Sequence, residues 1–334
     1  SSDFAIYDAQ DQLTLVKQCM KAAQMSVEAN PPKAILNHIS GFKNDFLLPE
    51  QLDLDSMPYG NKLRAAELYP LYQAALKSNN ALDFDDLLAF TAKLFQQISS
   101  LREYYDKKFK YILVDEFQDT NAAQYQLVHL LSRDFNNVCV VGDDDQSIYR
   151  WRGANIENIL NFEKDYPGTT VIKLEENYRS TQNILTAAGH VVRENQNRKE
   201  KTLWTQNEKG EPVICYRAED EINEAEFVCD RIQNLCQEEG YSFNEIAILY
   251  RTNAQSRVME DVLRRAEIPY QVIGGLRFYE RREVKDVLAY MRALINPDDS
   301  VSLKRIVNVP ARGIGKTSLE KVEFYCREKG LTLM

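Results

Sequence analysis

Two adjacent carboxylates directly after a short apolar run are the residues of this chain best suited to chemistry. Tyr111 to Val114 is typical of a strand buried in a parallel sheet, and Asp115 and Glu116 follow it at once. In open α/β sheets, ligands bind outside the carboxyl ends of the strands. An Asp there can hold Mg²⁺, and a neighbouring Glu can orient or deprotonate an attacking water. Taken alone, the pattern fits a plain acidic loop equally well.

Two further apolar runs are also followed by polar residues. Residues 138–141 precede the sequence Gly-Asp-Asp-Asp-Gln-Ser-Ile-Tyr-Arg-Trp-Arg-Gly at 142–153. Residues 171–174 precede Glu-Glu-Asn-Tyr-Arg-Ser-Thr at 175–181. Three such segments in order, separated by stretches with helical patterning, indicate βαβ units and predict an α/β fold with parallel strands.

Together the three segments resemble motifs II, III and IV of UvrD/Rep/PcrA-type superfamily 1 DNA helicases. The matching residues are 115–118 (Asp-Glu-Phe-Gln), 142–153 and 176–181, in the family's order and at similar spacing. A weaker likeness extends over nearly the whole chain. The resemblance implies RecA-like parallel-sheet motor domains with helical insertion subdomains. It further implies an ATP-dependent 3′→5′ DNA helicase that works in repair or replication, with ATP and Mg²⁺ as cofactors.

The resemblance also assigns roles to residues of the three motifs. Asp115 would coordinate Mg²⁺, Glu116 would activate the water that attacks the γ-phosphate, and Gln146 would sense that phosphate. Tyr178 would stack on the adenine, and Arg179 would neutralise charge on the transferred phosphoryl group. Arg179 falls in the second motor domain, so hydrolysis would require the two domains to close.

An aromatic and basic run shortly after Gln146 is the candidate DNA contact. Tyr149 and Trp151, with Arg152 beside them, combine stacking rings with a cation, as proteins that grip single strands do. Without the acidic segment upstream, Trp151 would fit a packing role in a domain core equally well. By resemblance, Tyr149, Trp151 and Arg152 would hold single-stranded DNA.

Weaker DNA-binding candidates lie further along the chain. Arg251 and Asn253 belong to a segment that matches the family in its second motor domain. Gly313 and Gly315 form a Gly-x-Gly turn before a predicted helix, which exposes backbone N–H groups that suit a phosphate. This turn resembles a hairpin turn that touches duplex DNA, and a plain turn between two helices is the alternative.

The resemblance divides the chain into four parts. Residues 1–97 resemble the helical 1B insertion, 98–176 the second half of motor domain 1A, 177–275 the first part of 2A, and 276–334 the start of helical 2B. Helical patterning predicts helices near 121–133, 154–165, 181–195, 222–239, 254–267 and 318–327. Apolar runs predict strands in the second motor domain at 213–216, 246–250 and 270–273.

Two acidic groups in the first part have a structural interpretation. Asp8 and Asp11 have the spacing of a helix N-cap and its third residue. Asp83, Asp85 and Asp86 could pass for a metal site. We interpret them as a cap with first-turn acids, because carboxylates there complement the helix dipole.

The family's phosphate-binding loop is absent from this sequence. The only Gly-Lys-Thr, at 315–317, has Pro310 where the first Gly of the pattern should stand. It also follows the acidic motif by ~200 residues, whereas a P-loop opens the first βα unit of such a domain. Motifs V and VI are not found before Met334. We therefore expect an internal piece of a longer helicase, one that hydrolyses ATP negligibly by itself.

Composition sets further bounds. The 334 residues, 44% hydrophobic and 27% charged, are ordinary for a soluble globular protein. No apolar stretch approaches the ~18 residues of a membrane span and the N-terminus shows no signal-peptide pattern, so we expect no membrane partner. The resemblance, to an intracellular family, implies a cytoplasmic protein. The net charge of −9 argues against a passive binder that holds duplex by charge alone. The six cysteines show no zinc spacing and predict reduced, buried thiols.

Three alternatives remain open. A helicase–nuclease subunit of the RecB/AddA kind would carry its nuclease beyond Met334, although the first block is compact for that subfamily. A two-metal nuclease could use Asp115, Glu116 and 143–145, but the aromatic and basic run would then have no role. A non-enzymatic DNA-binding module is the third. The expected partners are single-stranded DNA, junctions between single- and double-stranded DNA, and repair or replication proteins.

Overall fold

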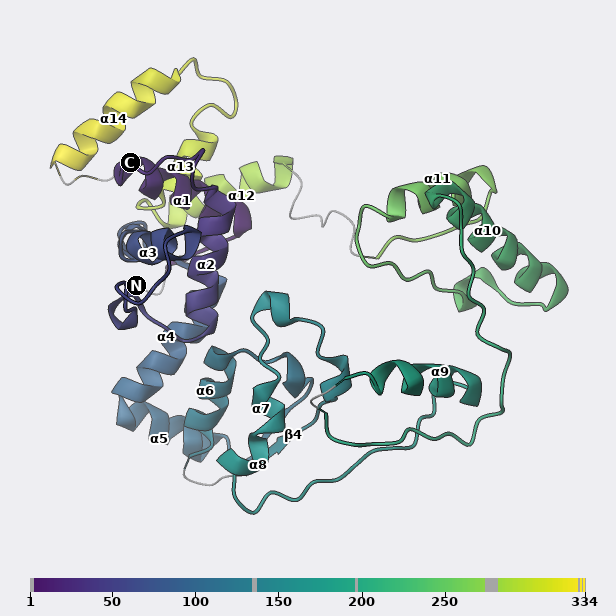
Figure 1. Cartoon of the computed structure of the whole chain (residues 1–334). Helices are drawn as coiled ribbons and strands as arrows, with labels where there is room; N and C mark the ends of the chain where they lie inside the picture. Colours follow the sequence, from purple (N-terminus) through teal and green to yellow (C-terminus); the bar gives the residue numbers. More distant parts are fainter. Residues whose placement is uncertain are drawn as a thin grey trace. The chain divides into compact units, whose positions relative to one another are not determined.

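The computed structural model describes residues 3–133, 137–195, 198–273, 282–329, 331 and 333. They fall into two compact units. Unit 1 comprises Ser1–Glu175, Val191–Thr202 and Arg282–Met334, and unit 2 comprises Glu176–His190 and Leu203–Arg281 (Figure 1). Helices with small parallel sheets make this an α/β fold, as the sequence predicts. The division into four parts stays a prediction.

A helical block around one apolar core begins unit 1. Its elements are β1 (Ala5–Tyr7), α1 (Ala9–Ala22), α2 (Pro32–Asn44), the 3-10 helix η1 (Pro49–Gln51) and α3 (Asn61–Ser78). Buried side chains from all three α-helices form the core. The Asp8 carboxylate accepts the N–H groups of Gln10 and Asp11, both at 2.9 Å, which confirms the predicted cap of α1.

A first parallel strand pair leads into the next helix. β2 (Ala81–Asp83) pairs with β1, and α4 (Phe84–Gln97) follows at once. Asp83 accepts the N–H of Asp86 at 2.9 Å, so the interpretation of these acids as a helix cap is confirmed. Both carboxylates are buried, and both pair with Lys43 of α2, at 2.6 and 2.7 Å.

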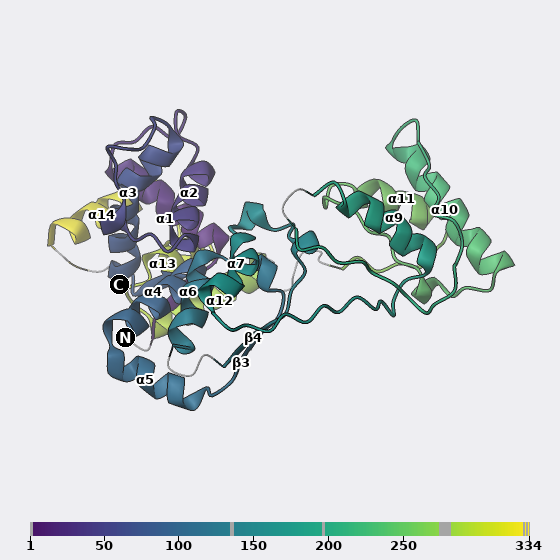
Figure 2. The same cartoon turned by 60° about the horizontal axis from the view of Figure 1, so that its bottom comes forward.

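A second parallel pair carries the acidic motif. β3 (Ile112–Val114) and β4 (Val138–Val140) run side by side, in the register Ile112↔Val138 (Figure 2). One face of the pair packs against Phe117 and Phe162. The other face is bare, since Leu113 is 78% exposed and Cys139 beside it is exposed too.

The remaining helices of unit 1 fall into two groups. The first group follows α4 along the chain: α5 (Ser99–Lys108), η2 (Phe117–Asp119), α6 (Ala122–Leu131), η3 (Asp144–Gln146), η4 (Arg150–Arg152), α7 (Glu157–Leu160) and α8 (Phe162–Asp165). The second group is α12 (Arg282–Ile295), α13 (Ser300–Ile306) and α14 (Lys316–Lys329), which lie near α1 of the first helical block. The single helix predicted at 154–165 is wrong. Its residues form two short helices, α7 and α8, because the backbone of Asn161 between them departs from helical geometry, with φ −95° and ψ 0°.

Unit 2 contains helices joined by long loops. They are α9 (Gln182–Val192), which continues into unit 1, α10 (Glu221–Glu238), η5 (Phe243–Glu245) and α11 (Ser256–Arg265). α10 and α11 lie side by side and share an apolar core that includes Cys229, Ile232 and Leu263 (Figure 1). The three helices predicted from periodicity in this region are therefore present, with ends shifted by a few residues.

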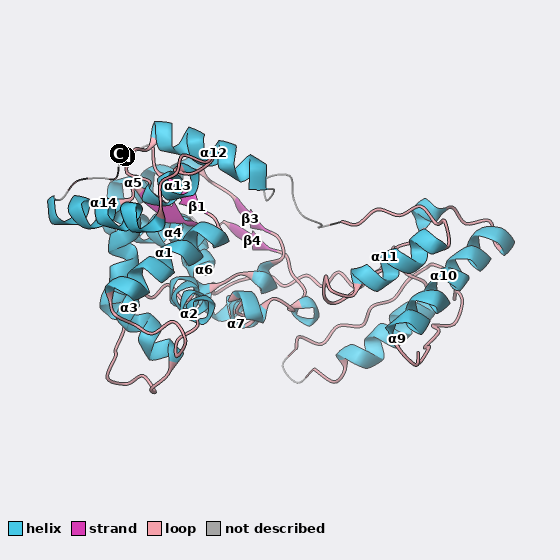
Figure 3. Ribbon diagram, turned by 90° about the horizontal axis from the view of Figure 1, so that it is seen from above, coloured by secondary structure: helices cyan, strands magenta, loops and turns pink. Residues whose placement is uncertain are grey.

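The strands predicted outside the two pairs are wrong. Residues 171–174, 213–216, 246–250 and 270–273 are all described, and none of them is a strand (Figure 3). An apolar run becomes a strand only where a neighbouring strand accepts its hydrogen bonds, and among the described residues these runs have no such neighbour. Leu174 and Leu249 are accordingly 77% and 93% exposed, whereas Ile246 and Ile248 pack against the core of unit 2 without strand pairing.

The cysteine prediction holds only in part. All six thiols are free, and Cys19 and Cys229 are buried as expected. Cys139 and Cys215 are exposed, which corrects the prediction for them, because the apolar runs that contain them are covered on one side at most. None of the helices within the described residues is both long and apolar enough to span a membrane.

Candidate functional site

The chain turns sharply after β3, and the paired carboxylates occupy that turn. Glu116 has a φ of +50°, a left-handed conformation uncommon outside glycine, and its N–H donates to Asp115 Oδ1 at 2.9 Å. Both carboxylates are exposed, whereas the next residue, Phe117, is fully buried against the ring of Phe162 at 5.5 Å. The buried ring fixes the turn so that the acidic pair faces solvent.

Gln118 joins the first motif to the second. Its Nε2 donates to Glu116 Oε2 at 2.7 Å, and its Oε1 accepts the N–H of Asp143 at 3.0 Å. It is 1% exposed, so water does not compete for these bonds. The sequence reasoning missed this residue. The available signal was its amide, which can donate and accept at once, two residues after the catalytic candidate.

Gly142 makes this approach of the two motifs possible. A Cβ atom at that position would lie 2.6 Å from Gln118 Oε1 and 3.2 Å from the backbone nitrogen of Phe117. The first distance is shorter than a Cβ atom tolerates, and the second is tighter than most such contacts. A side chain at position 142 would therefore displace Gln118, so glycine suits the place where the loop after β4 passes the turn after β3.

Gln146 is held in the same network. Its Nε2 donates to Asp143 Oδ2 at 2.7 Å, and its N–H donates to the Asp143 carbonyl at 2.9 Å. Its side chain remains exposed. The structure thus links Asp115, Glu116 and Gln146 through Gln118 and Asp143, while their catalytic roles stay predictions.

The three successive aspartates at 143–145 could hold a cation, because their oxygens lie within 4.8 Å of one another. Lys201 and Arg198 already pair with them, so the charge that a metal would meet there is largely neutralised. This disfavours a two-metal nuclease on these residues. The exposed oxygens of Asp115 and Glu116 are hard donors of the kind that Mg²⁺ prefers, and they fit a magnesium site better.

The aromatic run after Gln146 faces solvent. Trp151 is 64% exposed, and Tyr149 is 37% exposed. The Arg152 guanidinium lies 4.6 Å from the Trp151 ring centroid and 5.0 Å from that of Tyr149. A tryptophan exposed to this extent does not fill a core, so within the described residues the packing alternative is disfavoured.

Tyr178 and Arg179 belong to unit 2, where both side chains are exposed. Their backbone is fixed by Asn177, whose Oδ1 accepts the N–H of Arg179 at 3.0 Å. The Tyr178 hydroxyl donates to Glu176 Oε2 at 2.9 Å, and this hydrogen bond raises the pKa of the phenol. Their predicted roles across two domains stay predictions.

The weaker DNA candidates are exposed as well. Arg251 and Asn253 lie just before α11, where the Gln255 side chain accepts the Arg251 N–H at 3.1 Å. Gly313 has a φ of +70°, and the carbonyl of Gly315 accepts N–H groups from the first turn of α14. The Gly-x-Gly turn therefore leads into a helix as predicted, and its contact with DNA stays a prediction.

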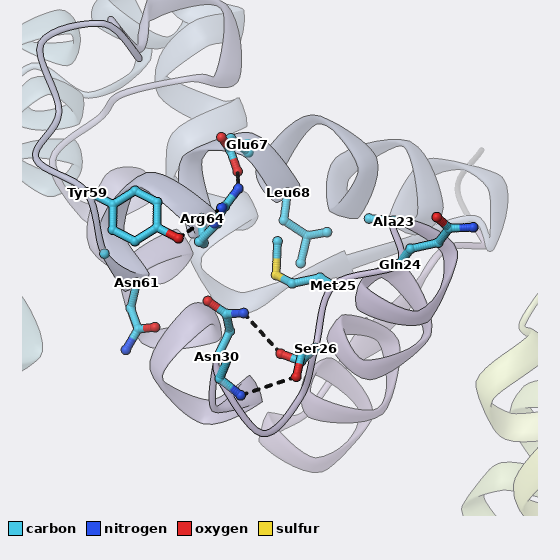
Figure 4. Close-up of a pocket in the computed structure, with 12 residues that line it drawn as sticks. Ala23, Gln24, Met25, Ser26, Asn30, Tyr59, Asn61, Arg64, Glu67 and Leu68 are labelled. Atoms are coloured by element: carbon cyan, nitrogen blue, oxygen red, sulfur yellow. Dashed lines mark hydrogen bonds and ion pairs between the residues drawn. The ribbon is translucent and has the colours of Figure 1, made fainter.

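A pocket of about 570 Å³ lies away from all these residues, between the end of α1 and the start of α3 (Figure 4). Arg64 is the cation on its wall, and it is paired with Glu67 at 2.8 Å and stacked on Tyr59 at 5.3 Å. None of the predicted site residues lines it. We therefore place the candidate site at the ends of β3 and β4.

Comparison with known proteins gives consistent matches. One family model, the UvrD/REP helicase N-terminal domain, matches residues 1–167, and another, the UvrD-like helicase C-terminal domain, matches residues 172–334. The ATP-dependent DNA helicase PcrA of Bacillus subtilis is 49% identical over 330 residues, which are 99% of this chain and 44% of that protein. The PcrA proteins of Staphylococcus epidermidis and Staphylococcus aureus are 46% identical over 331 residues, 45% of each. The chain spans less than half the length of these relatives.

Proposed function

Because the chain belongs to the UvrD/Rep helicase family, we propose that it is part of an ATP-dependent DNA helicase. The proposed activity couples ATP hydrolysis to 3′→5′ movement on single-stranded DNA and to unwinding of duplex, in repair or replication. The observation that carries it is the connected path from Glu116 through Gln118 and Asp143 to Gln146, with Trp151 exposed five residues further on.

The proposed catalytic roles are those that the resemblance assigns, and this path is compatible with them. Mg²⁺ bound with ATP would neutralise charge on the phosphates, and Asp115 would hold it. Glu116 would take a proton from the attacking water. Gln118 occupies one oxygen of Glu116 and thereby orients the carboxylate, which as an acceptor-only group still has capacity for a water. Gln146, Arg179 and Tyr178 would contact the γ-phosphate, the transferred group and the adenine.

The DNA-binding role rests on the loop that follows. One end of this loop contacts the acidic turn, through Asp143, and the other end presents Tyr149, Trp151 and Arg152 to solvent. A base stacked on such a ring contributes ~1–3 kcal/mol and needs no particular sequence. This explains how a chain with a net charge of −9 can grip single strands.

We further propose that β3 and β4 belong to a RecA-like sheet. Parallel sheets normally have both faces covered. The face that carries Leu113 and Cys139 is bare, although its residues are as apolar as those of a buried strand. That surface is suited to packing against further strands and helices of a motor domain.

The direct test is unwinding by the full-length helicase. We expect ATP-dependent strand separation of a duplex with a 3′ single-stranded tail and little separation with a 5′ tail. Equal unwinding of both substrates would contradict the polarity. Binding of DNA without any ATP-dependent unwinding would favour the non-enzymatic module instead.

A further inference from the structure

A short basic stretch after α9 returns to unit 1 and contacts the loop that carries Gln146. We call residues 198–201 the basic arm and residues 143–145 the acidic loop. The arm contains Arg198, Lys199 and Lys201, and it is separated from the loop by more than fifty residues of sequence. Neither the predicted catalytic roles nor the predicted DNA contacts use it.

Both ends of the acidic loop are bound by the arm. Arg198 forms a two-pronged contact with Asp145, from Nε to Oδ1 at 3.1 Å and from Nη2 to Oδ2 at 2.7 Å. Lys201 pairs with Asp143, with Asp144 at 3.0 Å and with Asp145 at 3.2 Å. The paired guanidinium and carboxylate planes fix orientation as well as distance.

The side chain of Lys199 behaves differently from its two neighbours. It pairs with Glu163 on α8, and only its backbone N–H reaches the loop, at 2.9 Å from Asp144 Oδ2. The arm therefore contains two cations that bind the acidic loop and one that does not.

These contacts are shielded from water. The side chains of Arg198 and Lys201 are 15% and 18% exposed, and that of Asp145 is 6% exposed. Ion pairs at this depth are screened much less than surface pairs. Burial alone would lower the pKa of Lys201, but its hydrogen bonds to the carboxylates raise that pKa above its usual value, so the lysine stays charged.

The acidic loop is also the support of the catalytic candidates. One oxygen of Asp143 accepts from Lys201 and the other accepts from Gln146. The N–H of the same residue donates to Gln118, which in turn holds Glu116. Lys201 is thus linked to Gln146 through Asp143. It is linked to Glu116, the proposed general base, through Asp143 and Gln118.

We propose that Arg198 and Lys201 are positioning residues of the motor. They hold the acidic loop in the conformation that presents Gln146 and fixes the Gln118 bridge to Glu116. The catalytic consequence of this inference rests on the proposed function. The contacts between the basic arm and the acidic loop do not depend on it.

Hydrogen exchange of the 334-residue chain tests the positioning directly. Lys201→Gln and Arg198→Gln should each speed exchange of the amides at 143–147 by at least about tenfold, because hydrogen bonds to charged groups are among the stronger ones and their loss opens the loop locally. Lys199→Gln is the matched control. It removes the same charge from the same arm and should change those rates less than about twofold, since ordinary surface changes have small effects.

A conservative variant guards against simple misfolding. Arg198→Lys keeps the positive charge beside Asp145 and should retain most of the slow exchange, whereas Arg198→Gln should not. Equal exchange rates in the Lys201→Gln, Arg198→Gln and Lys199→Gln variants, or equally fast exchange in Arg198→Lys and Arg198→Gln, would overturn the inference whatever the chain's activity.

The catalytic consequence is tested in the full-length helicase. Lys201→Gln should lower kcat of DNA-stimulated ATP hydrolysis by about tenfold and leave KM for ATP within about twofold, because the loss falls on geometry needed in the transition state. A purely structural role predicts fewer folded molecules with unchanged kcat per folded molecule, and that result would overturn the proposal. If the wild-type protein hydrolyses no ATP but the hydrogen-exchange results are as expected, the proposed function is wrong. The role of Arg198 and Lys201 in holding the acidic loop is then still supported.

Discussion

The two parallel strand pairs of unit 1 end in similar acidic sequences and use them in opposite ways. β2 ends at Asp83, with Asp86 soon after, and β3 is followed at once by Asp115 and Glu116. The first two carboxylates are 2% and 1% exposed and share the buried ammonium group of Lys43. The second two are exposed and have no lysine or arginine partner among the described residues.

The difference shows what turns an acidic strand end into a site. At β2 a third group, the Tyr72 hydroxyl, donates to Asp83 at 3.0 Å, so the cluster is closed to substrates. Burial raises the pKa of Asp86, and the charge of Lys43 opposes that change. At β3 the contacts come from a backbone N–H and one amide, which orient the oxygens without neutralising them. The first cluster stabilises the fold, and the second is available for chemistry.

The largest effect should come from Glu116→Gln in the full-length helicase. Glutamine keeps the shape and the contact with Gln118 but cannot accept a proton, so hydrolysis should fall by ~10²–10⁴-fold. ATP binding and the melting temperature should change little, because the residue is exposed. Steady-state hydrolysis, nucleotide binding and thermal melting measure the three quantities. A loss of less than tenfold would show that Glu116 is not the base.

Lys43→Met should have the second largest effect, and on stability alone. Removing the cation leaves the buried carboxylates of Asp83 and Asp86 without an opposite charge, which typically costs ~3–5 kcal/mol. Chemical denaturation of the 334-residue chain measures the loss. Lys93→Met is the matched control, because Lys93 pairs with the exposed Glu50 at 2.9 Å and such surface pairs contribute ~0–1 kcal/mol. Similar losses in both variants would show that the buried Lys43 cluster contributes no more to stability than a surface ion pair.

Sequence patterns predicted the parts of this molecule that depend on neighbours along the chain. Helix caps at Asp8 and Asp83 and the acidic turn after β3 follow from local spacing, and they were correct. Strands at 213–216 and 246–250 were not, because pairing depends on a distant partner that the apolar pattern does not reveal.

The sequence patterns also failed to reveal Lys43, Lys201 and Gln118, for the same reason: their partners are distant in the sequence. Lys43 lies 40 residues from Asp83, and Lys201 lies 58 from Asp143. A lone lysine in a sequence gives no sign of which carboxylate it will pair with. Gln118 was close enough to notice, but its role appears only when the loop after β4 lies beside it.

The smallest effect should come from Trp151→Ala, and it extends the comparison from acids to aromatics. Trp151 is 64% exposed, whereas Tyr72, beside the closed acidic cluster, is fully buried. In the full-length helicase, loss of one base stack should weaken binding of single-stranded DNA by ~1–3 kcal/mol and leave the melting temperature nearly unchanged. Tyr72→Ala should do the reverse, since truncating a large buried side chain typically costs ~3–5 kcal/mol of stability.

DNA-free hydrolysis should survive in the Trp151 variant because the contacts of Glu116 and Gln146 remain, while unwinding should fall. Fluorescence anisotropy with a labelled oligonucleotide and thermal melting of both variants separate the two roles. A marked drop in melting temperature of the Trp151 variant, with unchanged DNA affinity per folded molecule, would show that this ring packs instead of stacking on DNA.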